Sequence, residues 1–145
     1  MNVVIGIISR CNDIKIDEVL ISKRPKGSLQ GDLWEFPGGK IETEEAEFDA
    51  LRRELKEELD INVSVAEKVL QFSHKYPEEF IVFSVWYVRD FNGNATGKEG
   101  QKIAWVSCEK LKEYSFPVAN TSILRWISQN TVSYTHLRAH ETSID

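Results

Sequence analysis

The sequence has little cysteine and no cysteine pattern. Its two cysteines, Cys11 and Cys108, stand far apart in a chain of 145 residues and are not in a metal-ligand spacing. This scarcity argues against a disulfide framework and against a zinc-binding motif. It favours a reducing environment, so we expect an intracellular, cytoplasmic protein.

Long apolar runs are also missing. No stretch reaches the roughly 20 apolar residues that a membrane-spanning helix needs. The run VVIGIIS at residues 3–9 is too short for a signal or membrane helix, and no basic leader precedes it. Its β-branched composition predicts a buried strand, and we expect no membrane partner.

Excess positive charge is absent. The chain has 23 acidic residues against 18 lysines and arginines, a formal net charge of −5. Broad electrostatic binding to duplex nucleic acid is therefore not expected. The length suits one domain, which we place at residues 1–130 and expect to be a monomer.

The last segment, residues 131–145, lacks apolar periodicity and carries His136 and His140. It reads as translated vector sequence, and we exclude it from the functional interpretation as a non-native or disordered tail. The spacing of the two histidines would otherwise suggest a metal site, but such a spacing often arises by accident.

Local patterns predict strands that surround one long helix. Strands are predicted at residues 3–9, 18–22, 68–74, 80–89 and 102–106, and helices from 43 or 44 to 59 and at 121–129. A loop containing glycine and proline is predicted at 23–32, and a hairpin turn at 76–79. This order implies an α/β (α+β) fold, a mixed β-sheet with helices packed on its faces.

Negative charge is concentrated in one segment. Residues 42–60 hold nine carboxylates, opposed only by Arg52, Arg53 and Lys56. Helical periodicity assigns part of this segment to the core, in a stripe of Phe48, Leu51, Leu55 and Leu59.

Three of the acids share a face beside that stripe. Glu54, Glu57 and Glu58 stand at helical spacings of three and four, so their charges repel one another. A divalent cation such as Mg²⁺ or Mn²⁺ would turn that repulsion into binding. The alternative is a solvated helix face, the common role of charged runs.

The surrounding spacing favours the metal site. Gly39 is followed after five residues by Glu45, and after seven more by RELKEELDI at residues 53–61. This pattern resembles the Nudix box, GX5EX7REUXEEXGU, at every fixed position except one. Asp60 stands where the pattern has glycine, and we expect it to adopt a left-handed conformation at the helix end, at some loss of stability.

The likeness extends over roughly residues 3–128 and is closest to the MutT-type nucleoside triphosphate pyrophosphohydrolases. The segments WEFPGGKIE at 34–42, GKEGQ at 97–101 and FPVAN at 116–120 are similar to segments of those enzymes. The resemblance implies a Nudix-type α/β/α sandwich. It also implies metal-dependent hydrolysis within a triphosphate, which releases a nucleoside monophosphate and pyrophosphate.

The resemblance implies roles for the acidic residues. The metal ligands would be the carbonyl of Gly38 and the side chains of Glu54, Glu57, Glu58 and Glu99. Arg53 would orient the glutamates, and Glu45 would be a structural group. Either Glu54 or Glu99 would be the general base, and the sequence leaves that choice open.

The resemblance also implies a substrate pocket formed by Arg24, Glu35, Phe36, Pro37, Gly38 and Asn120. Arg24 would contact the phosphates. The Asn120 amide could pair with the O6 and N7 edge of a purine and favour 8-oxoguanine, whose N7 carries a hydrogen. Alternatively, Asn120 could cap the last helix.

Three functions follow. The first is cleavage of 8-oxo-dGTP, which cleans the nucleotide pool and prevents mutation during DNA replication. The second is Nudix hydrolysis of another substrate such as CTP, dCTP or ADP-ribose, since Leu29 replaces a histidine of the MutT pattern and Glu78 and Glu79 differ in charge from part of it. The third is a non-catalytic recognition module, which the retention of Arg53, Glu54, Glu57 and Glu58 argues against.

Overall fold

The computed structural model describes residues 1–12, 15–24 and 32–130. The strands are β1 (Asn2–Asn12), β2 (Lys15–Lys23), β3 (Trp34–Glu35), β4 (Gly38–Lys40), β5 (Asn62–Lys75), β6 (Phe80–Asn92) and β7 (Ile103–Ser107). The helices are α1 (Glu47–Leu59), the 3-10 helices η1 (Cys108–Glu113) and η2 (Val118–Asn120), and a C-terminal helix at 121–130. Leu29, most of the predicted loop at 23–32 and the tail at 131–145 lie outside the described residues.

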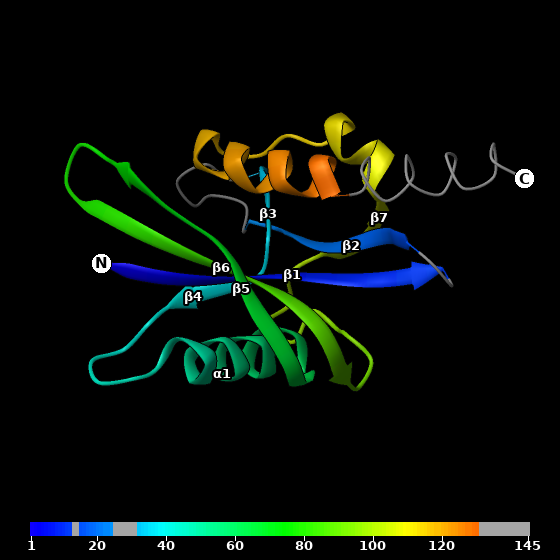
Figure 1. The fold of residues 1–145 in the computed structure, drawn as a ribbon, viewed down its shortest axis with the longest axis horizontal. Coiled ribbons are helices and arrows are strands. Elements are labelled where there is room, and N and C mark those ends of the chain that lie inside the picture. The colour runs from blue at the N-terminus through cyan, green and yellow to red at the C-terminus, as the bar shows by residue number, and fades with distance from the viewer. Residues whose placement is uncertain (13–14, 25–31, 131–145) are drawn as a thin grey trace, which may run out of the picture.

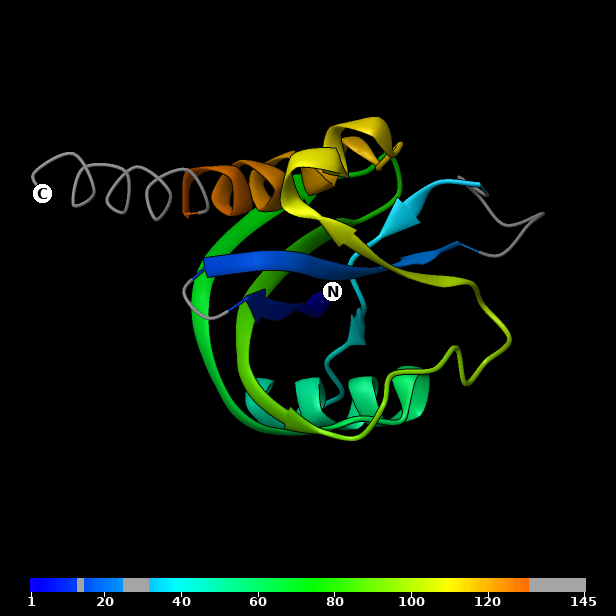
Figure 2. The ribbon, with the colours of Figure 1, turned by 90° about the vertical axis from the view of Figure 1, so that its right-hand side faces the viewer.

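The strands form one mixed sheet between two helical layers. The sheet order is β3-β2-β1-β6-β5, with β4 also paired to β1 and β7 to β2. β1 and β6 are parallel, and the other described pairings are antiparallel. Helix α1 covers one face, and η1, η2 and the C-terminal helix cover the other (Figures 1 and 2). The predicted α/β/α sandwich is therefore confirmed.

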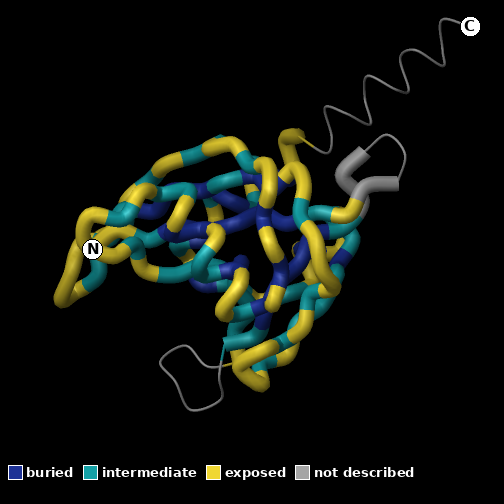
Figure 3. Tube along the Cα trace, turned by 90° about the horizontal axis from the view of Figure 1, so that it is seen from below, coloured by how far each residue is buried: buried dark blue, intermediate teal, exposed yellow. Residues whose placement is uncertain are grey.

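Two apolar clusters, one on each side of the sheet, form the core. Alternation in β1 divides its side chains between them, with Val4 and Ile8 in the cluster beneath α1 and Ile5 and Ile7 in the other. The buried residues accordingly gather in the middle of the molecule (Figure 3). Within the described residues, no helix is long and apolar enough to cross a membrane.

Helix α1 begins at Glu47, so the predicted start at 43 or 44 was wrong. Glu44 has a φ of 67°, and Ala46, just before the helix, is extended with a φ of −72° and a ψ of 149°. A turn closed by the Glu45 N–H to the Glu42 carbonyl, at 3.1 Å, occupies this segment. The charged segment therefore divides into a loop and a shorter helix.

The remainder of α1 agrees with its pattern. Leu51, Leu55 and Leu59 are fully buried, which confirms the core stripe. The helix ends at Asp60 with a φ of 58° and a ψ of 40°, and the Asp60 N–H donates to the Lys56 carbonyl. The expected left-handed end is therefore confirmed at this position.

Strand β5 begins at residue 62, six residues before the predicted start at 68. It pairs with β6 along its length, from Asn62 opposite Asn92 to Lys75 opposite Phe80, with three register shifts. The early part of β5 is mostly exposed, so strand-strand pairing defines it and apolar periodicity does not.

Candidate functional site

The acidic face of α1 points toward β4 and the loop that follows β6. Its three glutamates differ in exposure: the Glu54 side chain is 14% exposed, Glu58 is half-buried, and the Glu57 side chain is 56% exposed. Helix α1 includes all three positions, so their spacings of three and four residues place them on one face, as predicted.

Arg53 lies at the centre of a network of carboxylates. Its guanidinium donates from Nε to Glu45 Oε2 at 2.8 Å and from Nη2 to Glu45 Oε1 at 2.9 Å, a bidentate ion pair. Nη1 donates to Glu54 Oε1 at 3.0 Å and to Glu57 Oε2 at 3.4 Å. Nη2 also donates to the Lys40 carbonyl at 3.0 Å, which joins α1 to β4.

Glu45 completes the support of Arg53. Its Oε1 also accepts the Glu42 N–H at 3.0 Å. Hydrogen bonds from the Arg53 side chain and the Glu42 backbone lower the pKa of Glu45 to about 2. Glu45 therefore remains charged and keeps Arg53 directed at Glu54 and Glu57.

Glu54 packs directly against the backbone of β4. A Cβ added at Gly39 would lie 2.3 Å from the Glu54 carboxyl carbon, so only glycine leaves room for that carboxylate. Burial raises the pKa of Glu54, the neighbouring Arg53 lowers it, and the charges of Glu57 and Glu99 add to the increase.

Glu58 is the most perturbed carboxyl of the group. Burial, followed by the charges of Glu54, Glu35 and Glu99, raises its pKa to about 8, although a backbone hydrogen bond from Gly38 opposes the shift. Residues from α1, β3 and the loop after β6 thus direct negative charge at one point. Such a convergence is typical of a functional site.

Glu99 reaches this point from a loop attached to the end of α1. The Lys98 N–H and the Gln101 Nε2 both donate to the Glu58 carbonyl, at 3.0 and 2.9 Å. The Thr96 N–H donates to the Leu59 carbonyl at 3.0 Å. The loop thereby satisfies carbonyls that α1 leaves without partners inside the helix.

The donor set suits a hard divalent cation. Carboxylate and carbonyl oxygens are the ligands that Mg²⁺ and Mn²⁺ prefer. Burial, with the charges of the neighbouring acids, raises the pKa of Glu58, and a bound cation would offset both effects. Within the described ranges, no three His, Cys, Asp or Glu side chains are already grouped closely enough to hold a metal ion. Metal binding would therefore require the glutamate side chains to rotate inward.

A cavity of about 330 Å³ adjoins the acidic cluster. Five of the predicted substrate-binding residues line it: Arg24, Glu35, Phe36, Gly38 and Asn120. Pro37 is not among its lining residues; it is buried, and its carbonyl accepts the Gly6 N–H at 2.9 Å. The cavity meets the carboxylates at Glu35, Gly38 and Gly39.

The sequence interpretation missed one wall of this cavity. Tyr76, Glu79, Ile81 and Phe83, from the β5–β6 hairpin, contribute to the lining. Ile81 and Phe83 are two residues apart in β6 and so share a face, a signal that alternation could have given. No local pattern indicated that the hairpin turn would face the predicted pocket.

Arg24 and Glu35 form an ion pair at the cavity wall. Arg24 Nη1 donates to Glu35 Oε2 at 2.7 Å, and both side chains are about one third exposed. Burial raises the pKa of Glu35, while the charge of Arg24 lowers it. Arg24 Nε is buried without a hydrogen-bond partner in the described structure, so it is a donor available to an anionic ligand.

Asn120 lies in η2 and is 9% exposed. Within the described residues its side chain makes no hydrogen bond, whereas the Thr121 hydroxyl donates to the Val118 carbonyl at 2.7 Å. The alternative that Asn120 caps the last helix is therefore not supported. Its amide is available to a ligand in the cavity.

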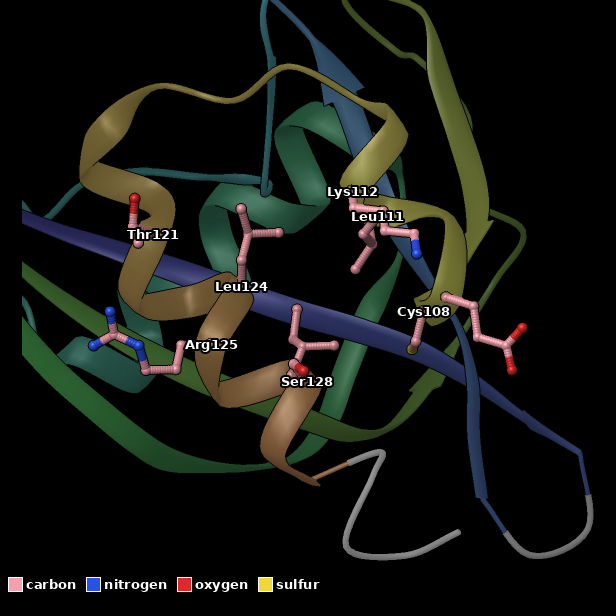
Figure 4. Close-up of a pocket in the computed structure, with 9 residues that line it drawn as sticks. Cys108, Leu111, Lys112, Thr121, Leu124, Arg125 and Ser128 are labelled. Carbon is pink, nitrogen blue, oxygen red and sulfur yellow. The ribbon is translucent and has the colours of Figure 1, made fainter.

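A second hollow, of about 540 Å³, lies between η1 and the C-terminal helix (Figure 4). Apolar residues such as Leu111, Leu124 and Ile127 form much of its wall. None of the predicted catalytic, metal-binding or substrate-binding residues lines it. The converging charges and the polar donors therefore favour the smaller cavity as the functional site.

Comparison with known proteins identifies the family of this chain. A family model described as the NUDIX domain matches residues 8–126. A CTP pyrophosphohydrolase from Escherichia coli (strain K12) is 37% identical over 107 residues, covering 74% of this chain and 79% of that protein. An 8-oxo-dGTP diphosphatase from the same organism is 32% identical over 124 residues, covering 86% and 93%.

A solved structure gives the same answer for the fold. It comes from work on MutT of Aliivibrio salmonicida and Vibrio cholerae, and it superposes with a TM-score of 0.76 at 36% identity. The match covers 87% of this chain and 94% of that one.

Proposed function

The chain belongs to the Nudix hydrolase family, with MutT-like proteins among its relatives, and we propose that it hydrolyses a nucleoside triphosphate to a monophosphate and pyrophosphate. The observation that carries this proposal is the junction of the acidic cluster and the cavity at Glu35, Gly38 and Gly39. A substrate in the cavity would extend its phosphates toward Glu54 and Glu58.

Nudix hydrolases generally use a divalent metal ion. We propose Mg²⁺, with Mn²⁺ as a substitute, held by Glu54, Glu57, Glu58, Glu99 and the Gly38 carbonyl. When bound, the cation supplies positive charge that polarises the phosphoryl oxygen and lowers the pKa of water.

The chain's own groups would hold the phosphates and move the proton. The Arg24 guanidinium, including its Nε, would donate to phosphate oxygens. The ion pair between Arg24 and Glu35 would orient the Arg24 side chain. Glu54 or Glu99 would accept the proton of the attacking water. The raised pKa of Glu54 makes it a better base than an ordinary glutamate, while Glu99 is the more exposed of the two.

The proposed substrate is 8-oxo-dGTP, and Asn120 supports this choice. Its amide oxygen would accept a hydrogen from N7 of the oxidised base, whereas the N7 lone pair of guanine would repel it. Leaving a buried polar group unpaired costs about 1–3 kcal/mol, which is roughly five- to 150-fold in preference. Phe36, which is stacked on Phe116 with ring centroids 5.2 Å apart, adds an aromatic surface beside it.

A cytidine triphosphate is the second candidate. A relative at 37% identity is named CTP pyrophosphohydrolase, and Glu79 lines the cavity. A carboxylate can accept a hydrogen bond from the exocyclic amino group of cytosine. Glu79 would then contribute to recognition of that base.

A substrate panel tests these proposals. The protein would be incubated with Mg²⁺ and 8-oxo-dGTP, dGTP, dCTP, CTP or ADP-ribose, and the pyrophosphate and monophosphate released would be measured. We expect 8-oxo-dGTP to have the highest kcat/KM. Equal values for dGTP and 8-oxo-dGTP would exclude the sanitation role, a higher value for CTP would support the second candidate, and no turnover would exclude both.

Two variants separate chemistry from recognition. Glu57→Gln should abolish metal-dependent turnover, with Glu113→Gln in exposed η1 as its matched control. Asn120→Ala should reduce the preference for 8-oxo-dGTP over dGTP while leaving turnover of dGTP nearly unchanged; Asn130→Ala, at an exposed position, is its control. An equal loss for both nucleotides would argue against base recognition by Asn120.

A further inference from the structure

The loop between β6 and β7 contains Gln101, whose side-chain amide forms hydrogen bonds through both its nitrogen and its oxygen. Gln101 Nε2 donates to the Glu58 carbonyl at 2.9 Å, and Gln101 Oε1 accepts the Glu99 N–H at 2.9 Å. One amide group thus connects the backbone of Glu58 to the backbone of Glu99. The charge of the Glu99 carboxylate also acts on the Glu58 carboxyl group.

The turn that carries Glu99 is compact. The Gly100 N–H donates to the Gly97 carbonyl at 2.9 Å, and Gly100 has a φ of 84°. A Cβ at Gly97 would lie 1.9 Å from the Gln101 carbonyl oxygen, so the turn folds tightly against the residue that leaves it. Gln101 is therefore held where its side chain can reach back to the Glu99 N–H.

Attachment of the loop does not depend on Gln101 alone. The Lys98 and Thr96 N–H groups donate to the carbonyls of Glu58 and Leu59 whatever side chain stands at 101. Within the described structure, however, the Gln101 amide is the hydrogen-bond partner of the Glu99 N–H. Loss of the amide should thus free the backbone of Glu99 while the loop stays attached to α1.

We propose that Gln101 is a positioning residue that fixes the direction of the Glu99 carboxylate relative to Glu58. The inference rests on the proposed function, in which Glu99 is a metal ligand or the general base. Glu99 is exposed and has a flexible side chain, so a mobile backbone would lower the fraction of time that its carboxylate points at the reacting phosphate. Gln101 contributes to catalysis only through Glu99.

Two substitutions at position 101 test this positioning role. Gln101→Ala removes both of them, while Gln101→Glu keeps an acceptor for the Glu99 N–H and replaces the donor to the Glu58 carbonyl by a charged oxygen. Both should lower kcat about 10- to 100-fold and change KM less than about twofold. Gln129→Ala and Gln129→Glu, on the exposed side of the C-terminal helix, are the matched controls.

Backbone amide hydrogen exchange gives a readout that does not depend on turnover. In Gln101→Ala the Glu99 amide should exchange at least about tenfold faster, while the amides of Lys98 and Thr96 keep their protection. Faster exchange of all three amides would show that Gln101 holds the whole loop. Unchanged exchange at Glu99 would show that Gln101 does not restrain the Glu99 backbone. Either outcome would overturn the proposal.

A double-mutant cycle tests whether Gln101 acts through Glu99. Glu99→Gln alone should lower kcat, and adding Gln101→Ala to it should cause less than about a twofold further loss. Multiplicative losses would overturn the proposal while leaving the proposed function intact. If Glu99→Gln has no effect on turnover, the assigned role of Glu99 fails, and the inference fails with it.

Discussion

Gly38 and Gly39 are adjacent in β4 but have different neighbours. A Cβ at Gly38 would lie 2.1 Å from the Val4 carbonyl oxygen and 2.8 Å from the Ile5 Cα, both backbone atoms of β1. A Cβ at Gly39 would instead meet the end of the Glu54 side chain, at 2.3 Å. Backbone in a central strand cannot yield easily, whereas a glutamate side chain can rotate.

Alanine substitutions should therefore separate stability from activity. Gly38→Ala should reduce the free energy of unfolding by about 3 kcal/mol or prevent folding. Gly39→Ala should cost less than about 1 kcal/mol but lower kcat/KM by roughly 100-fold, because Glu54 is displaced. Urea unfolding and steady-state kinetics measure the two effects, and similar stability losses for both variants would contradict this explanation.

Asp60 is another residue whose backbone governs the expected effect of substitution. Its left-handed conformation favours glycine and disfavours alanine, and its exposed side chain pairs with Lys56 at 2.7 Å. We expect Asp60→Gly to unfold at the same temperature as the native chain or slightly higher, because exposed ion pairs add little stability.

Asp60→Ala should unfold several degrees lower, because alanine lacks both the ion pair and tolerance of this conformation. Thermal unfolding followed by circular dichroism compares the two variants. If alanine and glycine gave the same midpoint, the ion pair and not the backbone would determine the effect.

At the scale of elements, the bond between Arg53 and Glu45 joins α1 to the loop that precedes it. The folded-state pKa of Glu45, about 2, lies below its ordinary value of 4.5. A lowered pKa stabilises the folded state at pH values above 4.5, and that contribution disappears as the pH falls from 4.5 toward 2.

As the pH falls through this range, the free energy of unfolding of Glu45→Gln should therefore decrease less than that of the native chain. The change in unfolding free energy between pH 5 and pH 3, measured by urea unfolding, gives the comparison. Equal changes in the two proteins would mean that protonation of Glu45 does not weaken the helix junction. Glu113→Gln, at an exposed site in η1, serves as the control.

Elements with a strong local signal were predictable. The 3.6-residue period placed Leu51, Leu55 and Leu59 in the core, and the spacing of the Nudix-box pattern located the glutamates on α1. The start of α1 was not predictable, because Glu44 takes a positive φ that glutamate rarely adopts. The early part of β5 depends on pairing with β6, a contact between distant residues that periodicity does not report.

At the scale of the whole molecule, the cavity combines residues that only the fold brings together. Arg24, Asn120 and Glu79 come from three distant parts of the chain. Resemblance to a known family indicated the first two. No local pattern placed the Glu79 side chain in the cavity or revealed the two hydrogen bonds of the Gln101 side chain, because both depend on how loops pack against other elements.

The assignment of residues 1–130 as the functional domain predicts the effect of truncation. A chain ending at Asn130 should keep the kcat/KM of the full chain within about twofold and its unfolding midpoint within a few degrees. Every residue assigned to the site lies before residue 121, and the control is the full chain prepared in parallel. A large loss of either quantity would show that residues 131–145 belong to the functional protein.

The parallel pairing of β1 with β6 has a consequence for synthesis of the chain. Residues 2–8 pair with residues 82–88, so the central strand leaves the ribosome well before its partner exists. At roughly 5–20 residues per second, about 80 residues take on the order of 4–16 s to translate. During that interval an apolar strand is exposed without its neighbour, and nascent chains should be most prone to aggregate, or to bind a chaperone, before β6 has emerged.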